Sequence, residues 1–288
     1  MRVTNRMIVQ SALRDLRQRL SGLATAQEQA ATGLRVQRAS DDPVAAAEIM
    51  RLRSHLRDIE QFHRNATSAT TRLSTEDAVE EALQGLLSEA RDILIGAAVD
   101  DPANPLRQEA LSAVRGIRDQ VIALANTRLG NEYVFAGTKT DKPPFLPDGT
   151  YQGDATARTV EVDTGVSVPF NHTGDRLFTG VLAALDKAVG TLESGTGQQV
   201  GACVGDLQTA GDQVSLAQAE VGAWLREIED VGAMLGRRTN DYLDRRQSLE
   251  EVDPSESLLK VISAQSALEQ AYEAVGRVLS SDITKHLG

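Results

Sequence analysis

The chain has 288 residues, a formal net charge of −11 and a hydrophobic content of 41%, yet only 3% of its residues are aromatic. An acidic balance argues against nucleic acid as the main partner, because phosphate binding needs a basic surface. A composition rich in Ala, Leu and Val but poor in aromatic rings is typical of helices that pack through small side chains. The length suits one elongated domain or two to three modules.

Cysteine usage and hydropathy exclude several further classes. Cys203 is the single cysteine, so we expect a small buried residue and neither an intramolecular disulfide nor a cysteine metal cluster. No apolar run approaches the roughly 18 residues of a transmembrane helix, which predicts no membrane insertion. The N-terminal segment MRVTNRMIVQSALRDLRQRL lacks a continuous apolar core, so no cleaved secretory signal is expected.

The first predicted element is a helix whose apolar residues recur at alternating spacings of three and four. That pattern is typical of a coiled-coil seam, and its length favours a coiled coil over an ordinary globular helix. Gly33 is expected to end this helix. The seam positions are Val9, Leu13, Leu16, Leu20, Leu23, Gln27, Ala30 and Leu34.

The next two helix starts are predicted by one aspartate–proline pair and one asparagine–proline pair. Asp42-Pro43 combines a capping side chain with a proline at the first helical position, and Asn104-Pro105 repeats the device. Between them, Ser74–Asp77 resembles a fresh capping signal, so a break is expected there. The helix after Pro105 is expected to end near Gly130.

Residues 131–178 differ from the rest, since they are rich in Tyr, Phe and Pro and contain two alternating runs, TVEVD and VSV. Gly and Asp separate these runs, which predicts a small β-rich insert built from hairpins. A short helix is expected at about 179–194, and the glycine-rich segment 195–201 is expected to be a loop.

The last third returns to seam spacing, first from Leu207 to Leu235 and then in a helix that starts at Asp253-Pro254. The predicted fold is therefore mainly α with a small β-rich insert, an elongated helical rod with a terminal coiled coil. Charge supports pairing of the ends: residues 1–72 hold 12 basic and 7 acidic residues (+5), whereas residues 201–288 hold 8 and 15 (−7). The alternative is a solvated charge pattern without a partner.

Candidate chemistry is sparse. The four histidines are not at metal-ligand spacing with one another or with the cysteine. The pairs Asp41/Asp42 and Asp100/Asp101 could serve as acid and base, but each precedes a helix-starting proline, where capping explains it. We therefore expect no enzyme, no catalytic residue, no cofactor and no bound metal.

Several motifs together resemble the flagellin family. RVTNRMI at 2–8, QEQAATGLRVQRASDDPVAAAE at 27–48 and SLLKVISAQSALEQAYEAVGRVLSSDI at 257–283 are similar to its terminal helices. Three further segments resemble the hook–filament junction members, the hook-associated proteins of the third type, more than filament flagellin. They are Asp41-Asp42-Pro43, LANTRLGNEYVFAGTKTDKPPF at 124–145 and GDATARTVEVDTGVSVPFNHTGDRLF at 153–178.

The resemblance implies a structural adaptor of the bacterial flagellum that is exported unfolded by the flagellar type III route. Implied partners are the hook-associated protein of the first type, flagellin, further copies of itself in a ring, and a cytosolic export chaperone that holds the C-terminal helix. The expected division is a terminal assembly domain (1–41 and 252–288), a helical rod domain (42–130 and 179–251) and a β-rich outer domain (131–178). The expected location is the extracellular hook–filament junction, reached from the cytoplasm.

Eight apolar seam residues are predicted to carry assembly: Leu13, Leu16, Leu20, Leu23, Leu258, Val261, Leu268 and Val275. Asn5 and Arg6 are either part of an export signal or an ordinary helix start. Two other functions stay open at this point, a filament-forming flagellin and an unrelated cytosolic helical scaffold. An enzyme is a remote third, motivated by the Asp pairs.

Overall fold

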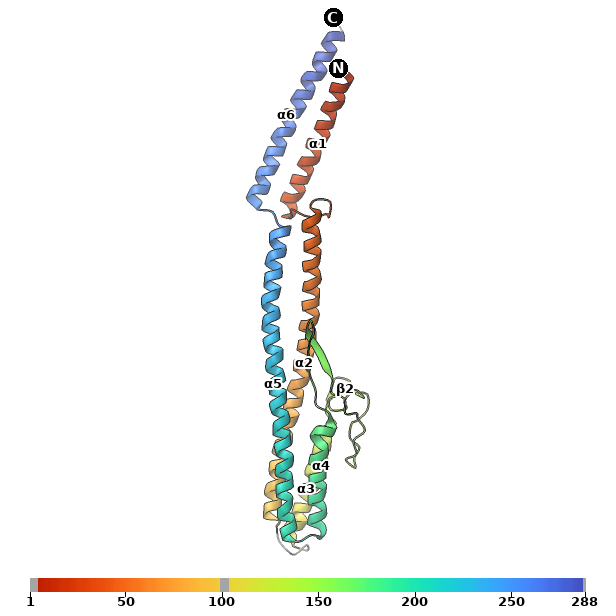
Figure 1. The fold of residues 1–288 in the computed structure, drawn as a ribbon, viewed down its shortest axis with the longest axis vertical. Helices are drawn as coiled ribbons and strands as arrows, with labels where there is room; N and C mark the ends of the chain where they lie inside the picture. Colours follow the sequence, from red (N-terminus) through yellow and green to blue (C-terminus); the bar gives the residue numbers. More distant parts are fainter. Residues whose placement is uncertain (1–4, 99–103, 287–288) are drawn as a thin grey trace. The chain divides into compact units, whose positions relative to one another are not determined.

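The computed structural model describes residues 5–98 and 104–286, with side chains described for residue 7 and for residues 10–98 and 104–277. Its helices are α1 (Asn5–Thr32), α2 (Pro43–Gly96), α3 (Pro105–Ala125), α4 (Gly174–Ser194), α5 (Gly197–Glu250) and α6 (Pro254–His286). Its strands are β1 (Arg128–Leu129), β2 (Glu132–Tyr133), β3 (Thr159–Asp163) and β4 (Val166–Pro169) (Figure 1). The predicted class, mainly α with a small β-rich insert, is confirmed. None of the helices, over the residues described, is apolar enough for long enough to cross a membrane.

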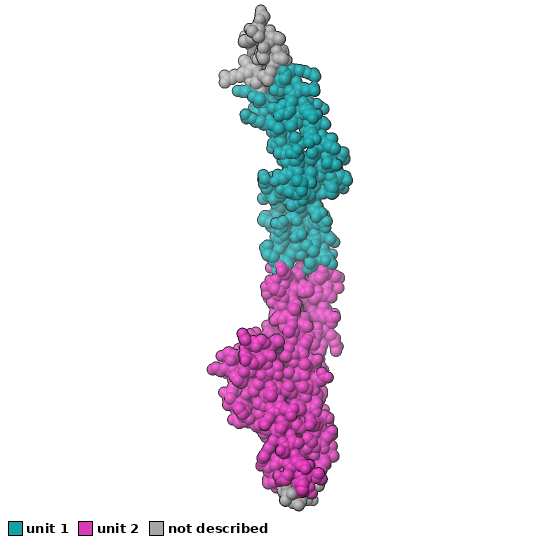
Figure 2. All heavy atoms as spheres, turned by 180° about the vertical axis from the view of Figure 1, so that it is seen from behind, with its two compact units in different colours: residues 1–57, 238–288 teal, residues 58–237 magenta. Residues whose placement is uncertain are grey.

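The chain divides into two compact units, coloured separately in Figure 2. Unit 1 comprises residues 1–57 and 238–288, and thus α1, α6, the start of α2 and the end of α5. Unit 2 comprises residues 58–237, and thus the remainder of α2 and α5 with α3, α4 and the strands.

In unit 1, α1 and α6 lie side by side, and α1 begins at the end of the pair where α6 finishes (Figure 1). Gly33 follows α1 with a φ of 70°, a left-handed conformation that glycine adopts without steric cost. At the start of α6, Asp253 Oδ1 accepts the backbone N–H of Ser255 at 2.7 Å. The predicted pairing of the terminal segments and both helix boundaries are confirmed.

The two chain segments that connect these helices to α2 and α5 are joined by a short antiparallel bridge. Leu34 pairs with Glu251. The N–H of Val252 donates to the carbonyl of Gly33 at 2.9 Å, and the N–H of Arg35 donates to the carbonyl of Glu250 at 2.7 Å. We call these contacts the clasp. A small apolar cluster lies beside it, made of Val36, Ala45, Ala46, Ile49 and Leu249.

The Asp41/Asp42 pair next to the clasp has a structural role, as the capping interpretation predicted. Asp42 Oδ1 accepts the N–H of Ala45 at 2.9 Å, and Asp41 Oδ2 accepts that of Arg38 at 2.8 Å. These backbone hydrogen bonds hold the pKa of both carboxyls below the usual value. The second pair, Asp100/Asp101, lies outside the described residues.

The core of unit 2 lies between α2, α3, α4 and α5 and is closed by three phenylalanine rings. Phe178 is fully buried, with its ring centroid 4.9 Å from that of Phe135 and 5.8 Å from that of Phe145, both in edge-to-face geometry. Cys203 is buried in the same core, as predicted.

Two polar side chains organise the helix ends of this core. Asn104 Oδ1 accepts the N–H of Leu106 at 3.0 Å, which confirms the predicted cap before Pro105. Arg107 is fully buried and donates to the carbonyls of Thr191 (2.5 Å), Leu192 (2.8 Å) and Gly195 (2.6 Å) at the end of α4. It thereby supplies donors to carbonyls of the last turn of α4, of which that of Thr191 also accepts the N–H of Gly195.

The insert consists of a hairpin, β3–β4, and a longer loop. Gly165 turns the hairpin with a φ of 74°, and Val162 and Val168 pack with Leu73 and Val221 of the long helices. In the loop, Gly137 has a φ of 68°, and a Cβ there would collide with Asp154. Asp154 accepts the N–H of Thr138 at 3.1 Å, so the Phe135–Thr138 motif forms a fixed turn.

Several predicted boundaries are wrong. α2 runs unbroken through Ser74–Asp77, because Glu76 faces the interior and accepts hydrogen bonds from His172 instead of capping a new helix. α3 ends at Ala125, and the chain to Gly130 contains β1. α4 begins at 174, and α5 begins at Gly197, so most of the expected loop 195–201 is helical.

A cluster of ionisable side chains lies inside unit 2, and we call it the Glu–His cluster: Glu76 and Glu80 of α2, His172 before α4, Arg176 of α4 and Glu220 of α5. His172 Nδ1 is 2.6 Å from Glu76 Oε1, and its Nε2 is 2.8 Å from Glu220 Oε2. Burial disfavours the imidazolium, but the neighbouring carboxylates of Glu76, Glu80 and Glu220 stabilise it more strongly and raise the pKa of His172 to about 10. Burial raises the pKa of Glu80 to about 7.

Candidate assembly interface

The pairing of α1 with α6 covers two heptad positions of each helix, one with large apolar residues and one with small residues such as Ala26 and Ala264. On α1, Leu16 and Leu23 are seven residues apart and half-buried; on α6, Val261, Leu268 and Val275 follow the same interval, with Leu268 at 9% exposure. Seven-residue spacing keeps side chains on one face of a supercoiled helix. We call these five residues the inner row.

A further heptad position on each helix is left uncovered. Leu13 and Leu20 of α1 are 42% and 40% exposed, while Leu258 and Tyr272 of α6 are 59% and 53% exposed. We call these four residues the outer row. The α1–α6 pair therefore covers the inner row and the small residues beside it, and leaves the outer row of each apolar stripe exposed within the chain.

Further large apolar side chains extend the exposed surface of the terminal helices. Met7, Leu259 and Ile262 are each more than half exposed. Contiguous exposed apolar patches are uncommon on monomeric soluble proteins and mark sites of interaction. The terminal helices therefore present a surface suited to further helices.

The eight predicted assembly residues thus do not share one closed seam. Five of them form the inner row, and Leu13, Leu20 and Leu258 belong to the outer row. Asn5 and Arg6 form the start of α1, and their side chains lie outside the described residues. Seam spacing alone does not distinguish the two rows, because it is the same in both.

The expected attraction between the basic N-terminal and acidic C-terminal segments appears near the clasp. Arg53 pairs with Glu250 in the expected sense, whereas the pair of Arg245 with Glu48, at 3.6 Å, has the reverse polarity; both pairs join α2 to α5 within unit 1. On α6, by contrast, Lys260 pairs with Glu256 at 2.7 Å, one turn away on the same helix. Exposed ion pairs of this kind contribute little to stability, so apolar contact dominates the α1–α6 pair.

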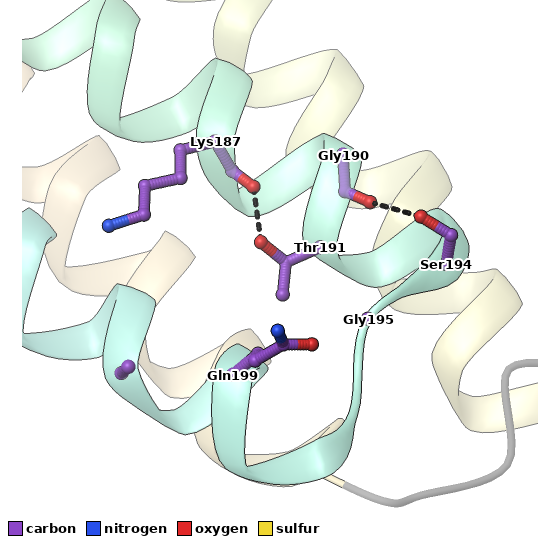
Figure 3. A pocket seen from close by; sticks show the side chains of 7 residues that line it. Lys187, Gly190, Thr191, Ser194, Gly195 and Gln199 are labelled. Atoms are coloured by element: carbon purple, nitrogen blue, oxygen red, sulfur yellow. Dashed lines mark hydrogen bonds between the residues drawn. The ribbon is translucent and has the colours of Figure 1, made fainter.

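A surface groove lies between α4 and the start of α5 (Figure 3). The hydroxyls of Thr191 and Ser194 donate to carbonyls of their own helix, those of Lys187 and Gly190. Lys187 pairs with Asp206 at 2.7 Å. The polar groups of the groove are thus engaged in the packing of α4 and α5, which favours the terminal helices as the functional surface.

Comparison with known proteins finds flagellar proteins similar to this chain. Residues 3–140 match the bacterial flagellin N-terminal helical region. Flagellar hook-associated protein 3 of Escherichia coli (strain K12) is 28% identical over an alignment that covers 95% of this chain and 96% of that protein.

Two solved structures share the fold. A protein described as a flagellar hook-associated protein, from Vibrio parahaemolyticus, superposes with a TM-score of 0.67 at 20% identity, covering 73% of this chain and 100% of that one. The flagellar junction protein FlgL from Legionella pneumophila superposes with a TM-score of 0.56 at 17% identity, covering 72% and 100%. The resemblance that the motifs predicted is confirmed: this chain is similar, along almost its whole length, to flagellar hook-associated protein 3.

Proposed function

We propose that this protein is a non-enzymatic structural adaptor of the bacterial flagellum that joins the hook-associated junction to the flagellin filament. The observation that carries the proposal is the outer row, an uncovered heptad position on both terminal helices. The names of the similar proteins, a hook-associated protein and a junction protein, supply the setting.

The proposed partners follow from this arrangement. The outer row binds terminal helices of neighbouring copies in a ring, of the hook-associated protein of the first type on one side and of flagellin on the other. Before export, a cytosolic chaperone covers the apolar face of α6. The chain leaves the cytoplasm unfolded by the type III route, and Asn5 and Arg6 belong to the signal for it.

The division of labour that we propose assigns assembly to residues 1–41 and 252–288, support to the helical segments 42–130 and 179–251, and the outer surface to residues 131–178. A long isolated helix is marginal in water unless its apolar face is covered. The terminal helices therefore reach full order once neighbours bury the outer row.

Electron microscopy of flagella from a deletion strain tests the adaptor role. We expect hooks without attached filaments and flagellin released into the medium. Normal filaments in the deletion strain would contradict the proposal.

Paired substitutions test the surface itself. The double variant Leu20→Asp with Leu258→Asp places charges in the outer row. The double variant Leu16→Asp with Leu268→Asp places charges in the inner row. Each double variant should abolish motility. The matched control is Gln18→Asp with Ser263→Asp, which adds the same charge at exposed polar positions of the same helices. Filament growth in either leucine variant, measured by electron microscopy, would show that the seam is wrongly assigned.

A filament-forming flagellin is the second candidate, because residues 3–140 match the flagellin N-terminal region. Copy number per flagellum separates the two functions: an adaptor is present in numbers comparable with hook components, a filament protein in great excess. A cytosolic scaffold would instead be found inside cells alone, and quantitative immunoblotting of cell and flagellar fractions measures both quantities.

A further inference from the structure

Two carboxylates in the Glu–His cluster lack the partners that buried charges need. Glu80 is fully buried and neither of its oxygens has a hydrogen-bond partner; Glu76, also fully buried, has one such oxygen, Oε2. His172 Nδ1 lies 3.6 Å from Glu80 Oε1, beyond hydrogen-bond distance. A buried carboxylate without hydrogen bonds is strongly unfavourable, so a further group is needed at this point.

The three side chains bring metal-binding atoms together. One carboxylate oxygen each of Glu76 and Glu80 and a ring nitrogen of His172 all lie within 4.8 Å of one another. Glu76 and Glu80 are four residues apart on α2 and so project from one face of the helix. His172 arrives from a different segment, just before α4, with 2% of its surface exposed.

The other ring nitrogen of His172 has the neighbour typical of a metal-bound histidine. Nε2 is 2.8 Å from Glu220 Oε2, and Glu220 is held in turn by Arg176 at 2.8 Å. Metal-binding histidines characteristically donate their second N–H to a carboxylate, which fixes the ring orientation and the tautomer. Nδ1 is then the nitrogen that faces Glu76 and Glu80.

The charge of the cluster also calls for a cation. A metal ion displaces the proton of the imidazole that it binds. With His172 then neutral, Glu76, Glu80 and Glu220 carry three negative charges and Arg176 carries one positive charge. Two charged neighbours have their own partners: Gln218 donates to Asp77 at 3.2 Å, and Glu132 binds Arg72 at 3.2 Å. The remaining charge of −2 is that which one divalent cation neutralises.

We propose that Glu76, Glu80 and His172 form a binding site for a divalent transition-metal ion, with Zn²⁺ as the best match. Zinc accepts mixed nitrogen and carboxylate ligands at about 2.0–2.2 Å in tetrahedral geometry, which places the ligand atoms about 3.3–3.6 Å apart. His172 Nδ1 already lies 3.6 Å from Glu80 Oε1, whereas its 2.6 Å contact with Glu76 Oε1 has to lengthen. Mg²⁺ prefers oxygen ligands and retains several waters, which suits a buried site with an imidazole poorly. The bound ion would tie α2 to the segment before α4.

Calorimetric titration of the purified full-length chain, freed of metal by a chelator, tests the site. We expect Zn²⁺ to bind with one high-affinity site per chain, Mg²⁺ to give no comparable binding, and Zn²⁺ to raise the thermal midpoint by at least about 3 °C. Glu80→Gln preserves the shape of the side chain but removes its charge, and should weaken Zn²⁺ binding at least tenfold.

The control is Glu81→Gln, one residue along α2 on its exposed face, which should bind Zn²⁺ as the unaltered chain does. Circular dichroism of metal-free Glu80→Gln shows whether the variant is folded, and His172→Gln serves as the second ligand variant. The proposal is overturned if the unaltered chain fails to bind Zn²⁺, or if folded Glu80→Gln and His172→Gln both bind it undiminished, since the cluster would then be neutralised by protons alone.

Discussion

The same heptad spacing has different consequences in the two units. In unit 2, the seam residues Leu207, Val214 and Val221 of α5 are fully buried, because other elements surround the helix. In unit 1, α1 and α6 have chiefly each other, so the outer row stays exposed. Periodicity therefore predicts that a face is apolar, while the number of neighbours decides whether the chain alone can bury it.

The difference predicts two kinds of stability. Unit 2 is expected to owe its stability to its own core, whereas the terminal helices of unit 1 are expected to gain theirs from assembly. Substitutions in unit 2 should therefore alter the isolated monomer, and substitutions in the outer row should alter assembly alone.

The largest effect on the monomer is expected from Phe178→Ala in unit 2. The ring is fully buried between Phe135 and Phe145, so its removal leaves a cavity and should lower the free energy of unfolding by about 3–5 kcal/mol. Urea denaturation followed by circular dichroism measures the change. The counterpart is Leu259→Ala in α6, where a side chain 67% exposed should cost less than about 0.5 kcal/mol. Equal losses in the two variants would refute the contrast.

A somewhat smaller loss is expected from Arg107→Met, which keeps the bulk of the side chain but removes its donors. The carbonyls of Leu192 and Gly195 then lose this donor, while that of Thr191 keeps the N–H of Gly195, and the free energy of unfolding should fall by about 2–3 kcal/mol in the same assay. Arg115→Met, on the same helix, breaks an exposed ion pair with Glu193 and should change stability by under about 1 kcal/mol. A neutral result for Arg107→Met would mean that water replaces the guanidinium.

A smaller difference should separate the two rows of unit 1. Leu268→Ala in the inner row is expected to weaken the α1–α6 pair by about 1–2 kcal/mol, because this side chain is 91% covered within the chain. Leu258→Ala in the outer row should leave the monomer unchanged. Amide hydrogen exchange in α6 reads out both variants, and faster exchange in Leu258→Ala alone would reverse the assignment of the rows.

The smallest effect concerns Asp154 in the loop of unit 2. Hydrogen bonds from Thr138 lower the pKa of this carboxyl from 3.8 to about 2. Because the folded-state pKa is the lower one, the contribution to stability is present above pH 3.8 and is lost as the pH falls through about 2. An NMR titration of the carboxyl carbon should show this midpoint and its rise in Thr138→Val; identical midpoints near 3.8 in both proteins would contradict the turn.

Much of the fold could be predicted from local chemistry. Asp42-Pro43, Asn104-Pro105 and Asp253-Pro254 start helices in the structure as they do in the sequence, because capping is decided by neighbouring residues. The hairpin likewise follows from alternation and from Gly165. These signals need no knowledge of distant segments.

The predictions from sequence failed where contacts with distant segments of the chain determine the structure. Ser74–Asp77 has the composition of a helix cap, yet Glu76 lies in the interior of unit 2. There it forms a hydrogen bond with His172, which is 96 residues away in the chain. The split of the seam into inner and outer rows depends on which helix arrives beside α1. The Glu–His cluster was missed for the same reason, since a search of histidine and cysteine spacing does not test glutamates against a histidine on another segment.

The clasp has a mechanical consequence for the terminal helices. α1 begins at the end of the pair where α6 finishes. A force that pulls the two termini apart therefore separates the contacts between α1 and α6 one after another, starting at the termini. The hydrogen bonds of Gly33 with Val252 and of Arg35 with Glu250 lie at the opposite end of the α1–α6 pair. They would therefore be the last of these contacts to bear the force. A load that draws both termini the same way along the helix axis would not slide the two helices past each other, so it would pass along both helices and reach the clasp through both connections.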